Sequence, residues 1–191
     1  MAPQNEYGQP IGHALPDFSG CAPLPRTAIT GKHCDVVPLS MDHAPDLHRA
    51  FAADQTGTLW TYMPIGPFAD ESAYAAWVTQ AAASRDPMFF AIIDKTDAAS
   101  VGVASYLRIK PEVGVAEVGY LTFAPRMQRT RIATEAMYLM MRRVFELGYR
   151  RYEWKCDALN APSRRAAERF GFAYEGTFRH ATIYKGRNRD T

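Results

Sequence analysis

The sequence is poor in cysteine, and none of its residues are spaced as a metal site or a disulfide framework requires. Its three cysteines, Cys21, Cys34 and Cys156, lie far apart and make an odd set among 191 residues. Such a set argues against paired disulfides and against zinc, and it suits a reducing compartment. The five histidines show no ligand spacing either. We therefore expect no bound metal, and we expect the protein in the cytoplasm.

Long hydrophobic runs are also missing. No run of about 18 apolar residues is present, so we expect no membrane span. The N-terminus has no basic segment followed by an apolar one, and it does not resemble a secretory signal. An apolar content of 47% and a charged content of 22% are ordinary for a globular protein, and the length fits one domain.

The net charge is only +2, but the two parts of the chain carry opposite charge. From Arg126 to the end, 13 Arg and 2 Lys stand against 7 acidic residues, a balance of +8, and the preceding residues have a balance of −6. A plain basic surface, a site for a nucleotide-sized polyanion and a nucleic-acid-binding module would each use this asymmetry. No nucleic-acid motif or continuous basic run accompanies it, so nucleic acid is the least favoured partner.

Residues 1–30 contain five of the 13 prolines and show neither the helix period nor the strand period. We expect an irregular N-terminal arm over 1–30 that wraps the domain or is partly loose. A single domain then follows over 31–191.

The hydrophobic periodicities of this domain predict an α/β (α+β) fold. Three consecutive strands form an antiparallel meander, and the last strand lies parallel to the strand before it, because a helix joins the two. Pro38 places the first strand at a sheet edge. The predicted strands cover 32–39, 88–93, 101–109, 115–124 and 152–158, the helices cover 42–54, 70–84, 132–147 and 160–170, and 172–179 and 181–185 are further extended segments.

The stretch 117–135 is the most informative part of the chain. A strand runs through Pro125 into a short loop that opens directly into a helix. A helix N-terminus carries unpaired N–H groups and a partial positive charge, which makes it an anion site. Arg126, Arg129 and Arg131 crowd the same turn, so the sequence predicts a polyanionic ligand there.

Two motifs taken together resemble the GCN5-related N-acetyltransferase (GNAT) superfamily, in particular its branch that acetylates ribosomal proteins and N-termini (RimJ/RimL-like). The superfamily carries V-x-P-x-x-[QR]-x-x-G-x-[GA] at its strand-to-helix turn, and the matching residues here are Phe123, Pro125, Gln128, Ile132 and Ala133. The second motif consists of Asn160-Ala-Pro-Ser163, then Arg169-Phe-Gly-Phe172, then Glu175-Gly176. Trp60-Thr-Tyr-Met-Pro64 is also similar to that branch, and the resemblance covers about residues 25–191.

This resemblance implies an acyltransferase fold whose mixed central sheet is flanked by helices and contains a parallel pair that splays apart. Acetyl coenzyme A (acetyl-CoA) would bind at the splay, with its diphosphate on the loop and helix amides and its pantetheine arm along the preceding strand. A backbone N–H of that strand would polarise the thioester oxygen. The residues that the resemblance assigns to the cofactor are Phe123, Gln128, Arg129, Thr130, Arg131, Ile132, Ala133 and Asn160.

The sequence departs from the family pattern at two places. Arg131 replaces the glycine that lets the backbone approach the diphosphate, and Arg129 stands at another common glycine position. Because arginine takes positive φ only at a cost, we expect an ordinary loop whose guanidinium groups hold phosphate. Many relatives also place a tyrosine, the proton donor to the leaving thiolate, where this chain has Ala167. Ser163 is the nearest substitute, and helping to cap its own helix is its alternative role.

The family usually has one more strand beside 152–158, after the segment at which this sequence ends. Residues after 181 show no apolar alternation from which to build it. The strand could lie beyond the sequence, residues 181–191 could form it, or another chain could supply it.

An amine acceptor must lose a proton before it attacks, which calls for a carboxylate that acts directly or through water. Glu117 is the first candidate, since it opens its strand and shares a face with Leu121 and Phe123. Asp157, at the C-terminal end of its strand, is the second, and Glu175 is the third. Each of these has the alternative role of a solvated strand charge.

For two further sets of residues, a functional role and packing in the core are the alternatives. The aromatic loop 59–68 and the helix after it supply candidates for the acceptor pocket, namely Trp60, Tyr62, Met63 and Tyr74. Cys156 could form an acyl-enzyme, but its alternation with Trp154 and Ala158 favours a buried thiol.

These inferences predict an enzyme that moves an acetyl group from acetyl-CoA directly to a primary amine, without a covalent intermediate. The acceptor is a protein N-terminus or a small-molecule amine, and the protein is a monomer or a homodimer. Two other functions stay open. One is a non-catalytic acyl-CoA-binding protein, favoured by Arg131 and Ala167, and the other is a basic nucleic-acid-binding module.

Overall fold

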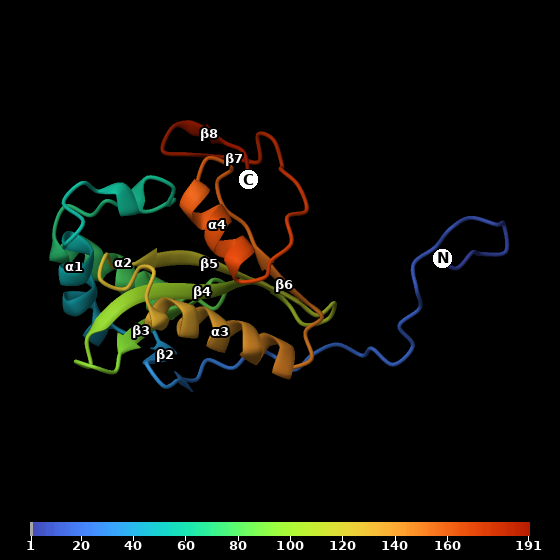
Figure 1. The fold of residues 1–191 in the computed structure, drawn as a ribbon, viewed down its shortest axis with the longest axis horizontal. Helices are drawn as coiled ribbons and strands as arrows, with labels where there is room; N and C mark the ends of the chain where they lie inside the picture. Colours follow the sequence, from blue (N-terminus) through green and yellow to red (C-terminus); the bar gives the residue numbers. More distant parts are fainter. Residues whose placement is uncertain (1) are drawn as a thin grey trace.

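The computed structural model describes residues 2–191 and contains one six-stranded sheet and one separate two-stranded sheet (Figure 1). In spatial order the large sheet consists of β1 (Ile29–Thr30), β2 (Cys34–Pro38), β3 (Met88–Asp94), β4 (Ser100–Lys110), β5 (Val115–Phe123) and β6 (Arg151–Trp154). Neighbouring strands are antiparallel from β1 to β5, whereas β5 and β6 are parallel. The predicted fold class, with its meander and its parallel pair, is confirmed.

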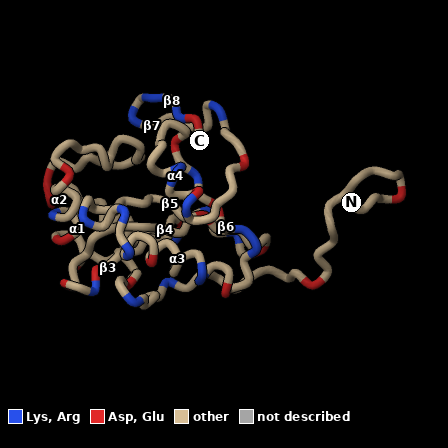
Figure 2. Tube along the Cα trace, viewed as in Figure 1, with Lys and Arg blue, Asp and Glu red and all other residues tan. Residues whose placement is uncertain are grey.

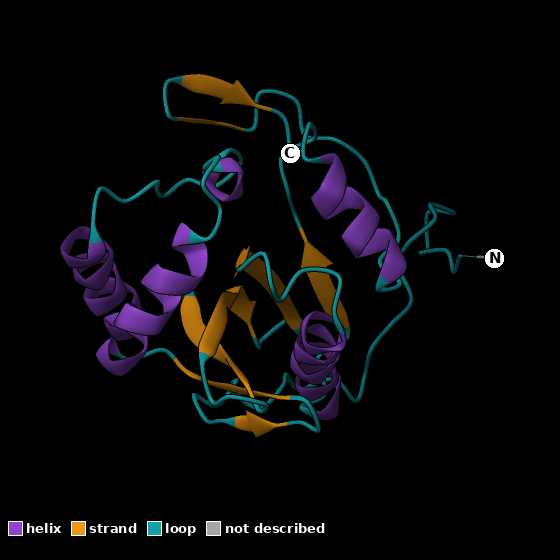
Figure 3. Ribbon diagram, turned by 60° about the vertical axis from the view of Figure 1, so that its left-hand side comes forward, coloured by secondary structure: helices purple, strands orange, loops and turns teal. Residues whose placement is uncertain are grey.

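Helices cover both faces of the sheet (Figure 3). One hydrophobic core lies between the sheet and α3, and a second lies between the sheet and the pair α1 and α2. The helical elements are η1 (Met41–His43), α1 (Ala44–Ala52), η2 (Thr58–Trp60), α2 (Glu71–Ala83), α3 (Arg131–Glu146) and α4 (Ala161–Arg169), and the small sheet consists of β7 (Thr182–Tyr184) and β8 (Arg187–Arg189).

The helices begin and end where local sequence signals place them. The Asp70 side chain accepts a hydrogen bond from the Ala73 N–H at 2.8 Å, which caps α2 at the start of the predicted helix 70–84. Gly148, just after α3, has a φ of +89°, a conformation that favours glycine. Ala133, Met137, Met140 and Val144 form a buried apolar stripe along this helix, so its methionines pack in the core.

The N-terminal edge of the sheet differs from the prediction. β1 pairs with β2, so the strand that contains Pro38 is not the edge, and the sheet begins before residue 31. Pro38 is tolerated because it is the last residue of β2. Ile29 is buried, but a strand of two residues is too short to show a period in the sequence.

β5 contains a backbone irregularity that periodicity does not reveal. Tyr120 has a φ of +51°, and the register between β4 and β5 shifts opposite it. Such a bulge moves the alternation of side chains by one residue. Val118 packs on the α3 side before the bulge, and Leu121 and Phe123 pack on that same side after it. Glu117 therefore does not share a face with Leu121 and Phe123, and that prediction is wrong.

The end of the chain forms the separate hairpin β7–β8. After the hairpin, the Asp190 carbonyl accepts a hydrogen bond from the Ala158 N–H at 2.9 Å, and Thr191 exchanges two backbone hydrogen bonds with Phe178. Within residues 2–191, no strand pairs with the outer edge of β6. The alternative in which residues 181–191 form that strand is wrong.

The N-terminal arm contacts the domain over its second half, and its first half projects away (Figure 1). Arg26 donates a hydrogen bond to the Ser84 carbonyl at 3.1 Å, near the end of α2. Arg143 of α3 donates to the Thr27 carbonyl at 2.6 Å. None of the helices between residues 2 and 191 is long and apolar enough to cross a membrane.

Candidate active site

The turn between β5 and α3 presents unpaired backbone N–H groups. Thr130 caps α3, with its side-chain oxygen 3.5 Å from the Ala133 nitrogen. Over the described residues, no acceptor lies within hydrogen-bond distance of the N–H groups of Arg129, Arg131 and Ile132. Three such donors at the positive end of a 16-residue helix form an anion site.

Arg129 adopts the left-handed backbone conformation, with a φ of +62°. The expectation of an ordinary loop is therefore wrong at this residue. The conformation costs a residue other than glycine about 1–2 kcal/mol. The neighbouring Thr130 holds the turn, because its N–H and its hydroxyl both donate to the Met127 carbonyl, at 3.3 and 2.6 Å. Arg131 is the first residue of α3 and needs no positive φ.

The three arginines of the turn have different partners. Arg126 is engaged with Asp97, at an Nη1–Oδ2 distance of 2.8 Å. Arg129 and Arg131 have no acidic side chain within ion-pair distance in the described part of the chain. Both line an open hollow at the start of α3, together with His33. Two of the three predicted cations are therefore free to meet an anion.

β5 and β6 separate at their C-terminal ends. Their pairing stops at Val118 and Trp154, so β6 ends earlier than the predicted strand 152–158. The edge of β5 from Gly119 onward then faces no other strand of the described chain. At the end of that edge, Gln128 Nε2 donates to the Phe123 carbonyl at 2.9 Å and braces the turn.

Glu117 is buried, with an exposure of 3%, and its two carboxylate oxygens are both engaged. Arg108 Nη1 lies 2.6 Å from one oxygen, and Lys155 Nζ lies 2.7 Å from the other. Lys155 also contacts Glu153. Burial lowers the pKa of Lys155, but its hydrogen bonds to Glu117 and Glu153 outweigh that effect and raise it. Because a cation occupies each carboxylate oxygen, neither oxygen is free to meet an amine, which weakens the first candidate base.

Asp157 is buried, at 6% exposure, and lies just beyond the end of β6. One carboxylate oxygen accepts a hydrogen bond from the Leu159 N–H at 2.8 Å, and the other accepts from the Tyr184 hydroxyl at 2.8 Å. Burial and this hydrogen bond raise the pKa of Tyr184 to about 12. No cation pairs with Asp157 in the described residues, unlike Glu117, so its charge is not neutralised.

The start of α4 brings together the residues of the second motif. Asn160 is the N-cap, and its side-chain oxygen accepts from the Ser163 N–H at 3.1 Å. The Ser163 hydroxyl oxygen accepts from Trp154 Nε1 at 3.0 Å, which ties α4 to β6. The hydroxyl hydrogen of Ser163 has no acceptor among the described residues.

The aromatic residues proposed for the acceptor pocket fall into two groups. Trp60 and Tyr74 are buried, at 8% and 1% exposure, in a cluster of edge-to-face rings with Phe51. Core packing is therefore their structural role. Tyr62 and Met63 are half-buried, so their side chains remain accessible from the loop.

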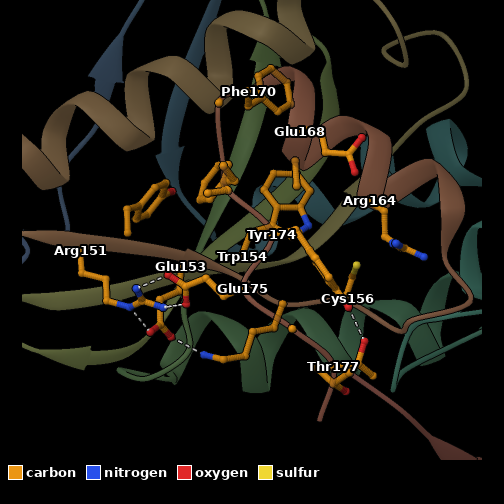
Figure 4. Close-up of a pocket in the computed structure, with 18 of the residues that line it drawn as sticks. Arg151, Glu153, Trp154, Cys156, Arg164, Glu168, Phe170, Tyr174, Glu175 and Thr177 are labelled. Carbon is orange, nitrogen blue, oxygen red and sulfur yellow. Dashed lines mark hydrogen bonds and ion pairs between the residues drawn. The ribbon is translucent and has the colours of Figure 1, made fainter. Parts of the chain in front are cut away.

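A groove of about 720 Å³ lies beside β6 (Figure 4). Glu175 lines it and binds Arg151, with an Nη1–Oε1 distance of 2.8 Å. The hydrogen bond from Arg151 lowers the pKa of Glu175, which opposes a role as a base. Cys156 also lines the groove and is half-buried. The expectation of a buried thiol is wrong because β6 ends at Trp154 and the strand alternation does not continue.

Sequence reasoning missed several residues of this region. Nothing in the sequence indicated that Arg108 would reach Glu117 from the neighbouring strand. Glu153 and Lys155 are two residues apart in the predicted strand 152–158, and that spacing could have predicted their contact. The contact of Tyr184 with Asp157 joins segments 27 residues apart, and no local signal marks it.

Comparisons with known proteins identify a family and similar structures for this chain. A model of the acetyltransferase (GNAT) domain matches residues 35–173. A GCN5-related N-acetyltransferase from Brucella melitensis is 41% identical, with a TM-score of 0.89 over 92% of this chain and 80% of that chain. A probable acetyltransferase of the GNAT family from Chromobacterium violaceum is 39% identical, with a TM-score of 0.87 over 95% of this chain and 91% of that chain. Among curated proteins, none matches this sequence.

One more distant structure shares the fold alone. It is an acetyltransferase from Salmonella typhimurium that modifies the N-terminal serine of a 50S ribosomal subunit protein. It is 20% identical, with a TM-score of 0.69 over 87% of this chain and 94% of that chain.

Proposed function

Because the chain belongs to the GNAT acetyltransferase family, an acetyl-CoA-dependent group of N-acetyltransferases, we propose that it acetylates a primary amine. The acceptor in this proposal is a protein N-terminus or a small-molecule amine. The observation that carries the proposal is the turn before α3, where three unpaired N–H groups and two unpaired guanidinium groups meet.

The turn fits the diphosphate of acetyl-CoA. The N–H groups of Arg129, Arg131 and Ile132 lack acceptors, and phosphate oxygens would complete their hydrogen bonds. The guanidinium groups of the two arginines would add charge-assisted bonds. Thr130 and Gln128 support the site by fixing the turn. The small Ala133 side chain faces the core, away from the ligand.

The free edge of β5 fits an extended arm. Backbone groups from Gly119 to Phe123 have no strand against them on the side where β6 departs, and an extended pantetheine would pair with them as an added strand. Asn160 lies at the start of α4, across the splay, with its side-chain oxygen used by the cap. Its amide nitrogen is the group that we assign to the cofactor.

Bound acetyl-CoA supplies a thioester carbonyl that an amine can attack. In the transfer, the amine nitrogen bonds the acetyl carbon and the carbon–sulfur bond breaks. We assign the amine proton to Asp157, directly or through water, because its charge is not neutralised by a cation. We assign protonation of the leaving thiolate to Ser163, whose hydroxyl hydrogen is free. Tyr62 and Met63 are the accessible side chains that would contact the acceptor.

A thermal-shift titration with acetyl-CoA, followed by thiol detection over a panel of amines, tests the proposal. Saturating acetyl-CoA, at about 100–1,000 times its dissociation constant, should stabilise the fold by about 3–4 kcal/mol. Thiol release should follow with at least one amine. Stabilisation without thiol release would indicate a non-catalytic acyl-CoA binder. The absence of both stabilisation and thiol release would refute the proposal.

The variant Asp157→Asn separates chemistry from binding. It keeps the size of the side chain and removes the charge, so kcat should fall at least about a hundredfold, which is the lower end of general-base effects. The stabilisation by acetyl-CoA should not change. An unchanged kcat would remove Asp157 as the proton acceptor.

A further inference from the structure

The β7–β8 hairpin is joined to two parts of the candidate acceptor site. The Tyr184 hydroxyl donates to Asp157 Oδ2 at 2.8 Å, and Lys185 Nζ donates to the Trp60 carbonyl at 2.6 Å. The first contact reaches the end of β6, and the second reaches the aromatic loop at η2. Figure 1 shows the hairpin above α4, on the side toward which the loop with η2 extends. The hairpin therefore forms a wall of the region where an amine would approach Asp157.

The face of the hairpin that meets Asp157 carries two arginines. Tyr184 is paired with Arg187 and Thr182 with Arg189, and residues directly opposite in an antiparallel pair share a face. The guanidinium carbon of Arg189 lies 5.5 Å from the centre of the Tyr184 ring. In Figure 2 the basic residues mark this hairpin clearly.

Within the described chain, the cations of the hairpin have no acidic partners: Arg189 is half-buried, and Lys185 and Arg187 are exposed. The Nε atom of Arg189 is buried and has no hydrogen-bond partner. Across the described residues, no acidic side chain lies within ion-pair distance of Lys185, Arg187 or Arg189. Lys185 is bonded to a neutral carbonyl, and burial lowers its pKa. Asp157, which meets this face through Tyr184, already accepts hydrogen bonds from Tyr184 and Leu159.

A buried donor without an acceptor is costly, so native proteins rarely leave one unused. An anion is the acceptor that best suits this place, since three positive side chains share the wall. We propose that the β7–β8 hairpin binds carboxylate groups of the acceptor, so that the preferred substrate is a primary amine with carboxylates close to it. The planar guanidinium groups of Arg187 and Arg189 suit carboxylate geometry. This inference rests on the proposed acetyltransferase function, which it extends by a substrate class.

Matched pairs of acceptors test the inference. One pair consists of two peptides with a free N-terminal serine, one followed by four Asp and Glu residues and the other by the corresponding Asn and Gln residues. The second pair is glutamate and glutamine as free amino acids. Thiol release with acetyl-CoA should give a kcat/KM at least tenfold higher for the acidic member of one pair. The pair that shows the preference tells whether the carboxylates come from a peptide or from a small molecule.

The variants Arg189→Gln and Lys185→Gln should each reduce this preference at least fivefold, because each raises the KM of the acidic acceptor. The kcat/KM of the neutral acceptor should change little. Arg165→Gln is the matched control, because Arg165 is exposed on α4 and makes no ion pair with another described residue. Equal kcat/KM values within both pairs for the wild type would overturn the inference, while acetyl transfer itself would still stand.

A binding measurement keeps the two proposals apart. Fluorescence anisotropy of the C-terminally labelled acidic peptide should show saturable binding that Arg189→Gln weakens and Arg165→Gln does not. If no amine is acetylated but this binding holds, the hairpin site stands and the acetyltransferase proposal fails. If neither binding nor a preference is found, the hairpin inference is wrong.

Discussion

Glu135 joins the start of α3 to the turn between β1 and β2. One carboxylate oxygen accepts from the N–H groups of His33 and Cys34 at 2.6 and 2.8 Å, and the other accepts from the Lys32 N–H at 2.8 Å. Gly31 makes this approach possible, since a Cβ there would lie 2.6 Å from Glu135 Oε2. Burial raises the pKa of Glu135, but the three N–H bonds outweigh it and hold the pKa below its ordinary value.

We predict that Glu135→Gln lowers the free energy of unfolding by about 1–2 kcal/mol at neutral pH, a value reduced for solvent screening. A carboxyl group with a lowered folded-state pKa stabilises the fold above its unfolded pKa, near 4.5. That stabilisation is lost as the pH falls through the folded-state pKa. Urea unfolding of both proteins from pH 3 to pH 8 should therefore show a difference that shrinks below about pH 4.5.

The control for this prediction is Glu146→Gln on the same helix. Glu146 is 64% exposed and pairs only with Arg142 at 3.3 Å, so its loss should change stability by less than about 0.5 kcal/mol. A difference between wild type and Glu135→Gln that persists unchanged at pH 3 would contradict the role given to the charge.

Arg129 combines backbone strain with an unpaired charge, and two variants separate these effects. Arg129→Gly removes both, and Arg129→Ala removes the charge but keeps the positive φ of +62°. We expect glycine to be more stable than alanine by about 0.5–1 kcal/mol in urea unfolding. Acetyl-CoA affinity should fall equally in the two variants. A larger loss for glycine would mean that the rigid left-handed turn, rather than the guanidinium, sets the affinity.

Residue roles that depend on near neighbours could be predicted from the sequence. Asp70 caps α2 as expected, because the group that it binds is three residues away. Roles that depend on distant segments could not be predicted. The cations that meet Glu117 come from another strand and from beyond β6, and the partner of Asp157 comes from β7. No local pattern encodes such pairs.

At the level of elements, β5 and β6 pair as parallel strands as far as Val118 and Trp154 and separate beyond these residues. Glu117 lies under this junction and binds Lys155, which follows β6, and Arg108 of β4. The side chain of Arg108 is 58% exposed, whereas that of Glu117 is 3% exposed. Without its partners the Glu117 carboxylate would be buried and unpaired, whereas the Arg108 side chain without Glu117 would still contact water.

We predict that Glu117→Gln lowers the free energy of unfolding by about 1–3 kcal/mol, since it leaves Lys155 half-buried without one of its two carboxylates. Urea unfolding measures this loss, and acetyl-CoA stabilisation should survive at low denaturant. If stability were unchanged while turnover disappeared, Glu117 would be the catalytic base and the assignment to Asp157 would be wrong.

Helices were easier to predict than strands, for a physical reason. The boundaries of α2 and α3 follow from Asp70 and Gly148, which act within one helical turn. Strand boundaries depend on which neighbour supplies hydrogen bonds. The sequence could not show that β1 covers the edge of β2, nor that Tyr120 shifts the alternation of β5.

For the molecule as a whole, the order of elements and the two motifs were enough to predict the antiparallel meander and the parallel pair, but not β1 at the edge of the sheet. The end of the chain was not predictable in the same way. Residues after 181 lack alternation, and they form a hairpin whose contacts with Trp60 and Asp157 bring together three distant parts of the chain. Six of the 15 basic residues from Arg126 onward lie in the turn before α3 and in this hairpin.

The most direct test of the central claim is hydrogen–deuterium exchange of the wild-type protein with and without saturating acetyl-CoA. The amides of Arg129, Arg131 and Ile132 have no acceptors among the described residues, so they should exchange quickly in the free protein and slowly in the complex. We predict that peptides covering 124–137 gain the protection. Saturable binding of acetyl-CoA that leaves these peptides unchanged and protects another part of the chain would contradict the account.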